Sequence, residues 1–211
     1  MMRIRCAIFL AGILAAMGVW QIGQSAVVLA KAWLAPVLIE HSWAKAEAGA
    51  TGDALHPWPW ADMVPVAKLR FPDLAEERIA LSGGSGSAMA FGPTQIPQAP
   101  LPAFFGHRDT HFTVLRDLDV GDEIEWQAIG EPARSYRILE TAVLHKDQIR
   151  VPASEDGGMI ALVTCWPFDA VDTGGAMRYV VLARLSENPG VGQLAALPAS
   201  QVDQTAKSSS P

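Results

Sequence analysis

Cysteine is scarce in this sequence. Only two cysteines, Cys6 and Cys165, occur among 211 residues. Cys6 lies in an apolar N-terminal stretch and Cys165 in a distant strand-like run, so a disulfide would have to join a membrane-embedded thiol to a folded domain. We expect no such bond, because two bridged Cα atoms must lie within about 7 Å of each other. Cys165 should therefore be a free thiol, either a reactive nucleophile or a small buried hydrophobe.

The chain also lacks any run of lysines or arginines, and its formal net charge is −6. A nucleic-acid-binding protein needs a basic surface to displace counterions from phosphates. We therefore exclude nucleic acid as a partner. Half of the residues are apolar, which suffices for one domain of ordinary size with an accessory segment, but not for a second full domain.

A long apolar stretch without charge lies near the N-terminus, where Arg3 and Arg5 precede residues 6–30. A helix that spans a bilayer needs about 20 apolar residues, and basic residues before it indicate a cytoplasmic N-terminus. Residues 1–30 are thus expected to form a transmembrane helix. The chain would then be a single-pass protein of the inner (cytoplasmic) membrane, with its domain on the outer, periplasmic side. The alternative is a signal peptide cleaved near Gln24-Ser25-Ala26.

The rest of the chain divides into three parts. Residues 31–59 are expected to form a juxtamembrane helix or linker, whose helix ends before Gly49. Short apolar strands separated by turn residues predict a mainly β domain, a barrel or sandwich, over 60–186. The tail, 187–211, has the composition of a disordered segment. The seven predicted strands cover 64–71, 78–82, 103–106, 123–128, 135–144, 159–165 and 178–185.

Three residues of the predicted β domain fit nucleophilic catalysis. Cys165 ends a strand, and its thiol becomes a competent nucleophile only where the thiolate is stabilised or a base is adjacent. His107 follows another strand and is the candidate base or acid, with His111 as its competitor. Arg178 opens the strand after Cys165 and carries a permanently charged fork of donors. Such a group can stabilise the oxyanion of a tetrahedral intermediate.

Neighbouring residues are candidates for supporting roles. Thr164 should point to the opposite side of the strand from Cys165, and Asp109 shares a strand-end segment with His107. The run Trp166-Pro167-Phe168 could form an apolar wall for a substrate, or pack the barrel end. We expect no metal and no other cofactor: Asp169 and Asp172 supply too few oxygens for calcium, and His107 and His111 lack a third zinc ligand.

These motifs together resemble the sortases, a family of cysteine transpeptidases. The resemblance covers about 60–186 plus the N-terminal helix, and is closest to the sortases of Gram-negative bacteria, in which one enzyme typically accompanies a dedicated cell-surface substrate. Ala161 stands where the family motif usually has Thr. The residues that carry the resemblance are Gly106-His107-Arg108-Asp109-Thr110-His111, Leu162-Val163-Thr164-Cys165 and Arg178.

The resemblance implies a closed eight-stranded β-barrel that carries out acyl transfer. Cys165 would be the nucleophile that forms a thioester, His107 the proton donor and acceptor, and Arg178 the stabiliser of the oxyanion or substrate. The substrate would be a surface protein with a C-terminal sorting signal similar to Leu-Pro-x-Thr-Gly, and an unidentified amine or water would resolve the thioester. The alternatives are a purely hydrolytic cysteine peptidase and a membrane-tethered binding or scaffold domain without catalysis.

Overall fold

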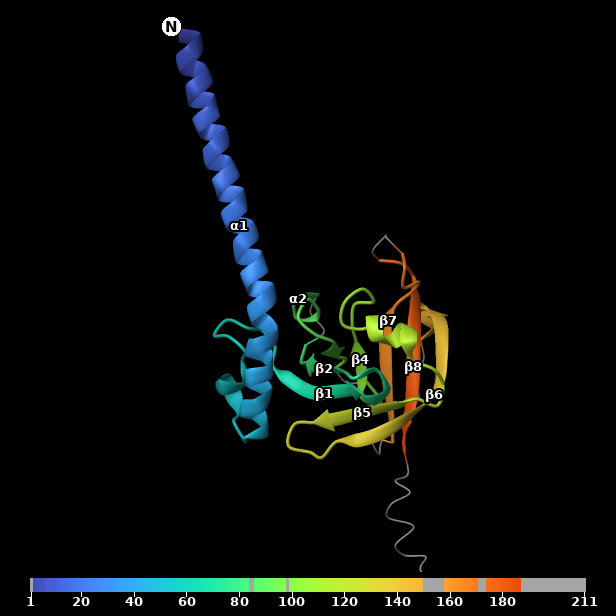
Figure 1. Cartoon of the computed structure of the whole chain (residues 1–211). Helices are drawn as coiled ribbons and strands as arrows, with labels where there is room; N and C mark the ends of the chain where they lie inside the picture. The colour runs from blue at the N-terminus through green and yellow to red at the C-terminus, as the bar shows by residue number, and fades with distance from the viewer. Residues whose placement is uncertain (1, 84–85, 98, 150–157, 171–173, 187–211) are drawn as a thin grey trace, which may run out of the picture.

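A closed β-barrel forms the body of the molecule. The computed structural model describes residues 2–83, 86–97, 99–149, 158–170 and 174–186. Eight strands follow one another around the barrel in the order β1-β2-β3-β4-β7-β8-β6-β5, beside the lower part of a long helix, α1 (Figure 1). The expected mainly β fold with an eight-stranded barrel is confirmed. The strands are β1 (Pro65–Phe71), β2 (Glu76–Leu81), β3 (Thr94–Gln95), β4 (Ala103–Phe105), β5 (Glu123–Ala128), β6 (Arg134–His145), β7 (Met159–Cys165) and β8 (Met177–Leu185).

Helical segments precede and connect the strands. The longest, α1, runs from Met2 to Glu47, and Gly49 follows it with a φ of +88°, a left-handed conformation that favours glycine at a helix end. The helical prediction for 31–48 is therefore correct to within one residue. The tail at 187–211, predicted to be disordered, lies outside the described residues. The other helical segments are η1 (Gly52–Leu55), η2 (Pro72–Leu74), α2 (Gly86–Met89), η3 (Thr113–Asp117) and η4 (Lys146–Gln148).

All seven predicted strands exist, and their bounds are close to those expected. The eighth strand, β3, has only two residues, and it pairs with Leu81 of β2 and with Phe104 and Phe105 of β4. A strand of this length shows no apolar alternation in the sequence. β3 forms because its pairing partners lie on either side, so sequence patterns alone do not predict this strand.

The barrel interior is filled from alternate positions of each strand. On β7, Ile160 and Leu162 are fully buried in the main core, together with Val181 and Ala183 of β8. Ala161, one position along from Ile160, lies instead in a second cluster with Leu101 and Ala103. Successive side chains of a strand point to opposite faces. Even-numbered positions of β7 thus face the interior, and odd-numbered positions face outward.

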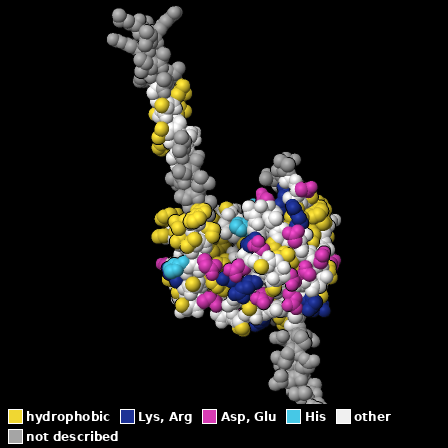
Figure 2. All heavy atoms as spheres, in the orientation of Figure 1, with side chains coloured by type: hydrophobic (Ala, Val, Ile, Leu, Met, Phe, Trp, Pro, Cys, Tyr) yellow, Lys and Arg dark blue, Asp and Glu magenta, His cyan; other side chains and the backbone are white. Residues whose placement is uncertain are grey.

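The last turns of α1 pack against the barrel. Trp43 is 4 % exposed, and the ammonium group of Lys68 on β1 lies 5.6 Å from the centre of its ring. Lys68, itself buried, also donates to Glu40 Oε1 at 3.0 Å. A buried ammonium is tolerated only with such partners, so these contacts attach α1 to the wall. Figure 2 shows hydrophobic side chains gathered where the helix meets the barrel.

The expected membrane anchor is wrong. A spanning helix needs about 20 predominantly apolar residues, and none of the helices in the described ranges meets the requirement of length and apolar character for crossing a bilayer. The predicted single-pass location in the inner membrane, with the domain on its outer side, is therefore contradicted.

We predict that Trp43→Ala lowers the free energy of unfolding by about 3–5 kcal/mol, the usual cost of truncating a buried tryptophan. Urea denaturation followed by circular dichroism measures this change. Trp33→Ala is the matched control, since it removes the same side chain from the same helix at a position 86 % exposed. Equal effects of the two substitutions would contradict the packing of α1 described above.

Candidate active site

The pairing of three neighbouring strands brings the predicted site residues to one end of the barrel. β4 runs parallel to β7 with Phe105 beside Val163, and the amide of Gly106 continues this pairing by donating to the carbonyl of Val163. His107 therefore follows the end of β4 at the same end of the barrel at which β7 ends in Cys165. β7 runs antiparallel to β8, and Cys165 is paired with Arg178. β4, β7 and β8 are neighbours in the barrel, so their pairing brings the segments that carry the histidine, the cysteine and the arginine to one end, although these residues are far apart in the sequence.

Cys165 lies on the outer face of the barrel wall. Its position has the same parity as Ala161, which faces away from the main core, and its thiol is free and half-buried. Arg178 has the parity of Leu182, which packs with Ala161 outside the core. The sulfur is therefore accessible from outside, in contrast to a cysteine that only fills space in a hydrophobic core.

Thr164 faces the opposite way, as the alternation of the strand predicts. It is fully buried, and its hydroxyl donates to the carbonyl of Gly106 at 2.7 Å. The amide of Gly106 in turn donates to the carbonyl of Val163 at 3.1 Å. These two bonds join the two residues before Cys165 to the residue before His107.

A tight turn presents His107 to solvent. His107 itself is exposed, and its carbonyl accepts a hydrogen bond from the amide of Phe112 at 2.9 Å. The Phe112 ring is fully buried beneath Gly106, where a Cβ would approach it to 2.7 Å. Glycine at position 106 is therefore required by the close approach of the ring, and the ring supports the backbone that carries the imidazole.

Arg178 is held by its own loop. Its Nη1 donates to the carbonyls of Gly175 and Met177, at 2.6 and 2.9 Å. A guanidinium has five donors in a rigid fork, so these two bonds do not exhaust it. The half-buried side chain can thus remain anchored while other N–H groups of the fork bind an oxyanion or a carbonyl.

The three residues after Cys165 form part of an aromatic cluster. The Trp166 ring stacks on that of Tyr179, with centroids 5.7 Å apart, and the Phe168 ring meets both edge-on. Phe168 and Tyr179 also pack against the main core. Pro167 is exposed, whereas Trp166 and Phe168 are half-buried. Phe168 thus closes the barrel end, while Pro167 and part of Trp166 remain on the surface beside Cys165.

His111 is close to the site but differs from His107 in its surroundings. Burial of the ring, supported by the charges of Arg78 and His107, lowers the pKa of His111 below its usual value of 6.5, while the Ala90 carbonyl and Asp109 act in the opposite direction. Its Nε2 donates to that carbonyl at 3.4 Å. Asp109 itself is exposed in the turn after His107.

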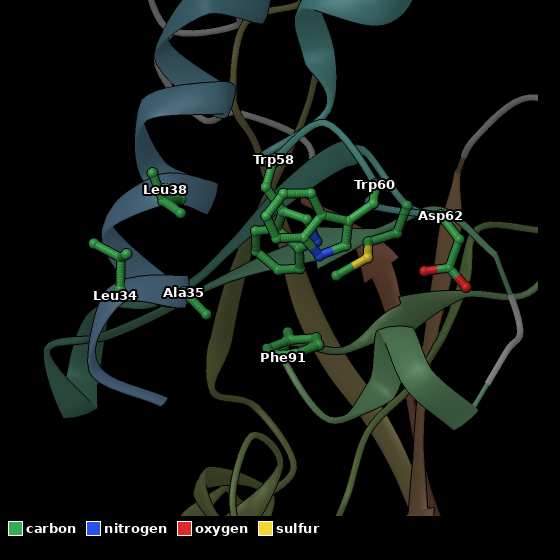
Figure 3. Close-up of a pocket in the computed structure, with 8 residues that line it drawn as sticks. Leu34, Ala35, Leu38, Trp58, Trp60, Asp62 and Phe91 are labelled. Carbon is green, nitrogen blue, oxygen red and sulfur yellow. The ribbon is translucent and has the colours of Figure 1, made fainter. Parts of the chain in front are cut away.

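The described residues include two hollows beside α1, and neither contains Cys165, His107 or Arg178. One, of about 340 Å³, is almost entirely apolar, and Figure 3 shows its tryptophans and Phe91 facing the α1 side chains. The other, of about 260 Å³, is lined by Glu40, Glu77, Arg78 and His111 among others. No three His, Cys, Asp or Glu side chains gather as a metal site within the described ranges. Asp172, weighed as a calcium ligand, lies outside them.

Three residues near the site were not among the sequence-based candidates. Tyr179 follows Arg178 directly, and its inward parity on β8 was the available signal. Arg108 belongs to the segment from Gly106 to His111 and Phe112 follows it directly, but the burial of both side chains depends on residues distant in the chain. Arg108 is 8 % exposed, and its Nη2 donates to the carbonyl of Ala170 at 2.7 Å.

Comparisons with known proteins agree on one family. The model of the sortase domain matches residues 69–186, more than half of the chain. Sortase A from Corynebacterium diphtheriae is 18% identical with a TM-score of 0.52, covering 74% of this chain and 87% of that one. Sortase A from Listeria monocytogenes is 19% identical with a TM-score of 0.50, covering 58% and 88%. No curated protein sequence matches.

A closed barrel with an outward-facing thiol at one end defines a fold suited to cysteine chemistry. With the family match, the chain belongs to the sortases, cysteine transpeptidases that act on surface proteins with sorting signals. The Gram-negative type expected from the motifs stays a prediction, because these matches do not distinguish it.

We predict that Gly106→Ala lowers the activity of the enzyme at least tenfold. The added methyl group collides with the Phe112 ring, and relief of such overpacking costs about 1–3 kcal/mol and shifts the backbone that carries His107. Gly86→Ala is the control, because a Cβ there meets nothing within 4 Å. Measured activity of Gly106→Ala within twofold of wild type would contradict the close contact.

The lowered pKa of His111 predicts a pH-dependent stability. Below about pH 6.5 the unfolded chain binds a proton more readily than the folded one, so the contribution of His111 to the free energy of unfolding falls on acidification. Relative to wild type, His111→Gln should become more stable as the pH drops from about 7.5 to about 5.5. Urea denaturation at both pH values checks this, with His41→Gln, an exposed position, as control. A pH-independent difference would disprove it.

Proposed function

We propose that this sortase transfers an acyl group from a sorting signal to an amine through a thioester on Cys165. The observation that supports the proposal is the pairing of Cys165 with Arg178, at the barrel end where the turn that carries His107 follows β4, with the thiol half-buried on the outer face. A nucleophile, a proton-transfer group and a cationic fork are the parts that acyl transfer requires.

In the first step, the Cys165 thiolate attacks the carbonyl carbon of the threonine in the signal. The developing oxyanion is stabilised by the guanidinium of Arg178. When the tetrahedral intermediate collapses, the C–N bond to the following residue breaks, and the imidazolium of His107 gives its proton to the departing amine. The products of this step are a thioester on Cys165 and a free C-terminal fragment.

In the second step, an amine attacks the thioester carbonyl. His107, now neutral, accepts a proton from the attacking nitrogen, and the C–S bond breaks to regenerate the thiolate. The new amide bond links the surface protein to its acceptor. Water in place of the amine gives hydrolysis with the same residues, so only the acceptor distinguishes a transpeptidase from a peptidase.

The neighbouring residues have supporting roles in this proposal. Thr164 holds the backbone between Cys165 and His107 through its bond to the Gly106 carbonyl. The exposed Asp109 adds negative charge near the imidazoles. Pro167 and Trp166, with Phe168 behind them, offer an apolar wall to the Leu-Pro part of a signal similar to Leu-Pro-x-Thr-Gly, because aromatic rings pack well against proline.

The proposal extends to the type of sortase and to its domains. We place the catalytic domain at 60–186, after a helix or linker over 31–59. The segment from Gly106 to His111 and the strand end at Cys165 support the Gram-negative type, in which a single enzyme serves a dedicated surface protein. A neighbouring gene for a protein with a C-terminal sorting signal would support this assignment.

The proposal predicts that the full chain consumes peptides with the core Leu-Pro-x-Thr-Gly and forms an amide-linked product when an amine such as triglycine is added. Mass spectrometry identifies that product and the thioester. Cys165→Ala should abolish both, and Arg178→Gln should lower kcat by about 10²–10³, the usual loss for one oxyanion donor. Arg184→Gln, an exposed arginine on the same strand, is the matched control.

Three results would reject parts of the proposal. Peptide consumption that survives Cys165→Ala would exclude the thiol as nucleophile. Hydrolysis without amide product, under every amine tested, would favour a cysteine peptidase. A Cys165 that resists alkylation in the folded chain would favour the non-catalytic binding domain.

A further inference from the structure

Two side-chain hydrogen bonds, called ties below, hold the residues directly before and after His107. The residue before it, Gly106, is bonded to the residue before Cys165, since the Thr164 hydroxyl donates to its carbonyl at 2.7 Å. The residue after it, Arg108, is bonded to the loop after Cys165, since its Nη2 donates to the Ala170 carbonyl at 2.7 Å. Each tie joins a neighbour of the imidazole to a segment that flanks the sulfur.

The Arg108 tie is built into the fold at both ends. The side chain is 8 % exposed, and its own carbonyl accepts a hydrogen bond from Thr113 Oγ1 at 3.0 Å, which closes the turn after His107. At the other end, the Ala170 amide donates to the carbonyl of Pro167 at 3.4 Å. The guanidinium thus connects two turns, one carrying the imidazole and the other following the thiol.

A second contact joins the loop after Cys165 to η3, the helix that follows the turn of His107. The guanidinium of Arg116, on η3, lies 5.4 Å from the centre of the Phe168 ring. Arg116 is exposed, and a cation–π contact at an exposed position is weak. A charged hydrogen bond from a buried arginine is stronger, so we expect Arg108 to contribute most of this connection.

We propose that Arg108 is a positioning residue, which sets the location of His107 relative to Cys165 by holding the turn at 107–112 against the loop at 166–170. His107 lies in a turn outside β4, so strand pairing alone does not hold it. The Thr164 tie holds the chain before the imidazole and the Arg108 tie holds it after. The inference rests on the proposed function, in which imidazole and sulfur act together.

Displacement of a reacting group by about 1 Å can cost 10² in rate. Loss of the tie is therefore expected to reduce kcat by about 10–100-fold while KM changes by less than about threefold, because the Arg108 side chain is buried and need not contact the peptide. Comparing the change in kcat with the change in KM separates a role in positioning from a role in substrate binding.

The test compares Arg108→Met, Arg108→Gln and Arg108→Lys with wild type and His107→Ala in the full chain. Met removes the donor, Gln keeps polarity but is too short to reach the carbonyl, and Lys restores one charged donor. Arg137→Met is the matched control, because Arg137 also bonds a backbone carbonyl, that of Gly121 at 3.1 Å, but is exposed on β6. Circular dichroism checks that each variant is folded.

The main readout is the rate of Cys165 alkylation by iodoacetamide as a function of pH, which needs no substrate. We expect the Arg108→Met and Arg108→Gln profiles to move toward that of His107→Ala, the Arg108→Lys profile to return toward wild type, and the Arg137→Met profile to match it. Measurements of kcat with the peptide should follow the same order.

Several outcomes overturn the inference. Three results would show that the tie serves the fold and not the position of the imidazole. They are a wild-type alkylation profile in Arg108→Met, a profile of Arg108→Lys that shows no recovery, and failure of both the Met and the Gln variant to fold. If His107→Ala itself alkylates like wild type, the cooperation of imidazole and thiol fails, and the proposed function fails with it. If His107→Ala differs but Arg108→Met does not, only the role of Arg108 is lost.

Discussion

The pairing register of β4, β7 and β8 is the constraint on which the site depends. Because β4 and β7 are parallel, their C-terminal ends meet at one end of the barrel, and the antiparallel β8 begins there. A slip of one residue would turn every side chain of β7 to the other face. Cys165 would then point into the core and Thr164 outward. The register is held by the burial of Ile160 and Leu162, so the packing of the core also decides the exposure of the thiol.

The site combines a rigid support with an accessible surface. Below the wall, the fully buried Phe112 and Thr164 fix the backbone on either side of the reacting groups. Above it, the imidazole is exposed and the thiol half-buried, which a peptide substrate requires. The aromatic cluster of Trp166, Phe168 and Tyr179 connects the core to the surface beside Cys165, since the rings of Phe168 and Tyr179 pack on the core. A substitution that loosens the core is therefore expected to affect the chemistry as well as the stability.

Much of the barrel could be predicted from the sequence, because seven of its strands are long enough to show apolar runs bounded by turn residues. The two-residue β3 showed no such pattern. The N-terminal prediction failed in another way. Apolar composition over residues 6–30 indicated a membrane span, but no helix in the described part of the chain qualifies as one. The helix continues to Glu47, and its last turns pack on the barrel through Trp43 and Lys68, which composition could not show.

The residues alone indicated which chemical groups the site can use: a single thiol in the predicted domain, a histidine after one strand, and an arginine at the start of the strand that follows the thiol. Strand alternation also predicted the opposite directions of Thr164 and Cys165. Barrel closure, in contrast, brought the turn that carries His107 to the end of the barrel at which Cys165 lies, and it brought Arg108 to Ala170, 62 residues away. The physical reason is that local patterns specify the direction of a side chain within its strand, whereas the neighbours of that strand depend on the closure of the barrel.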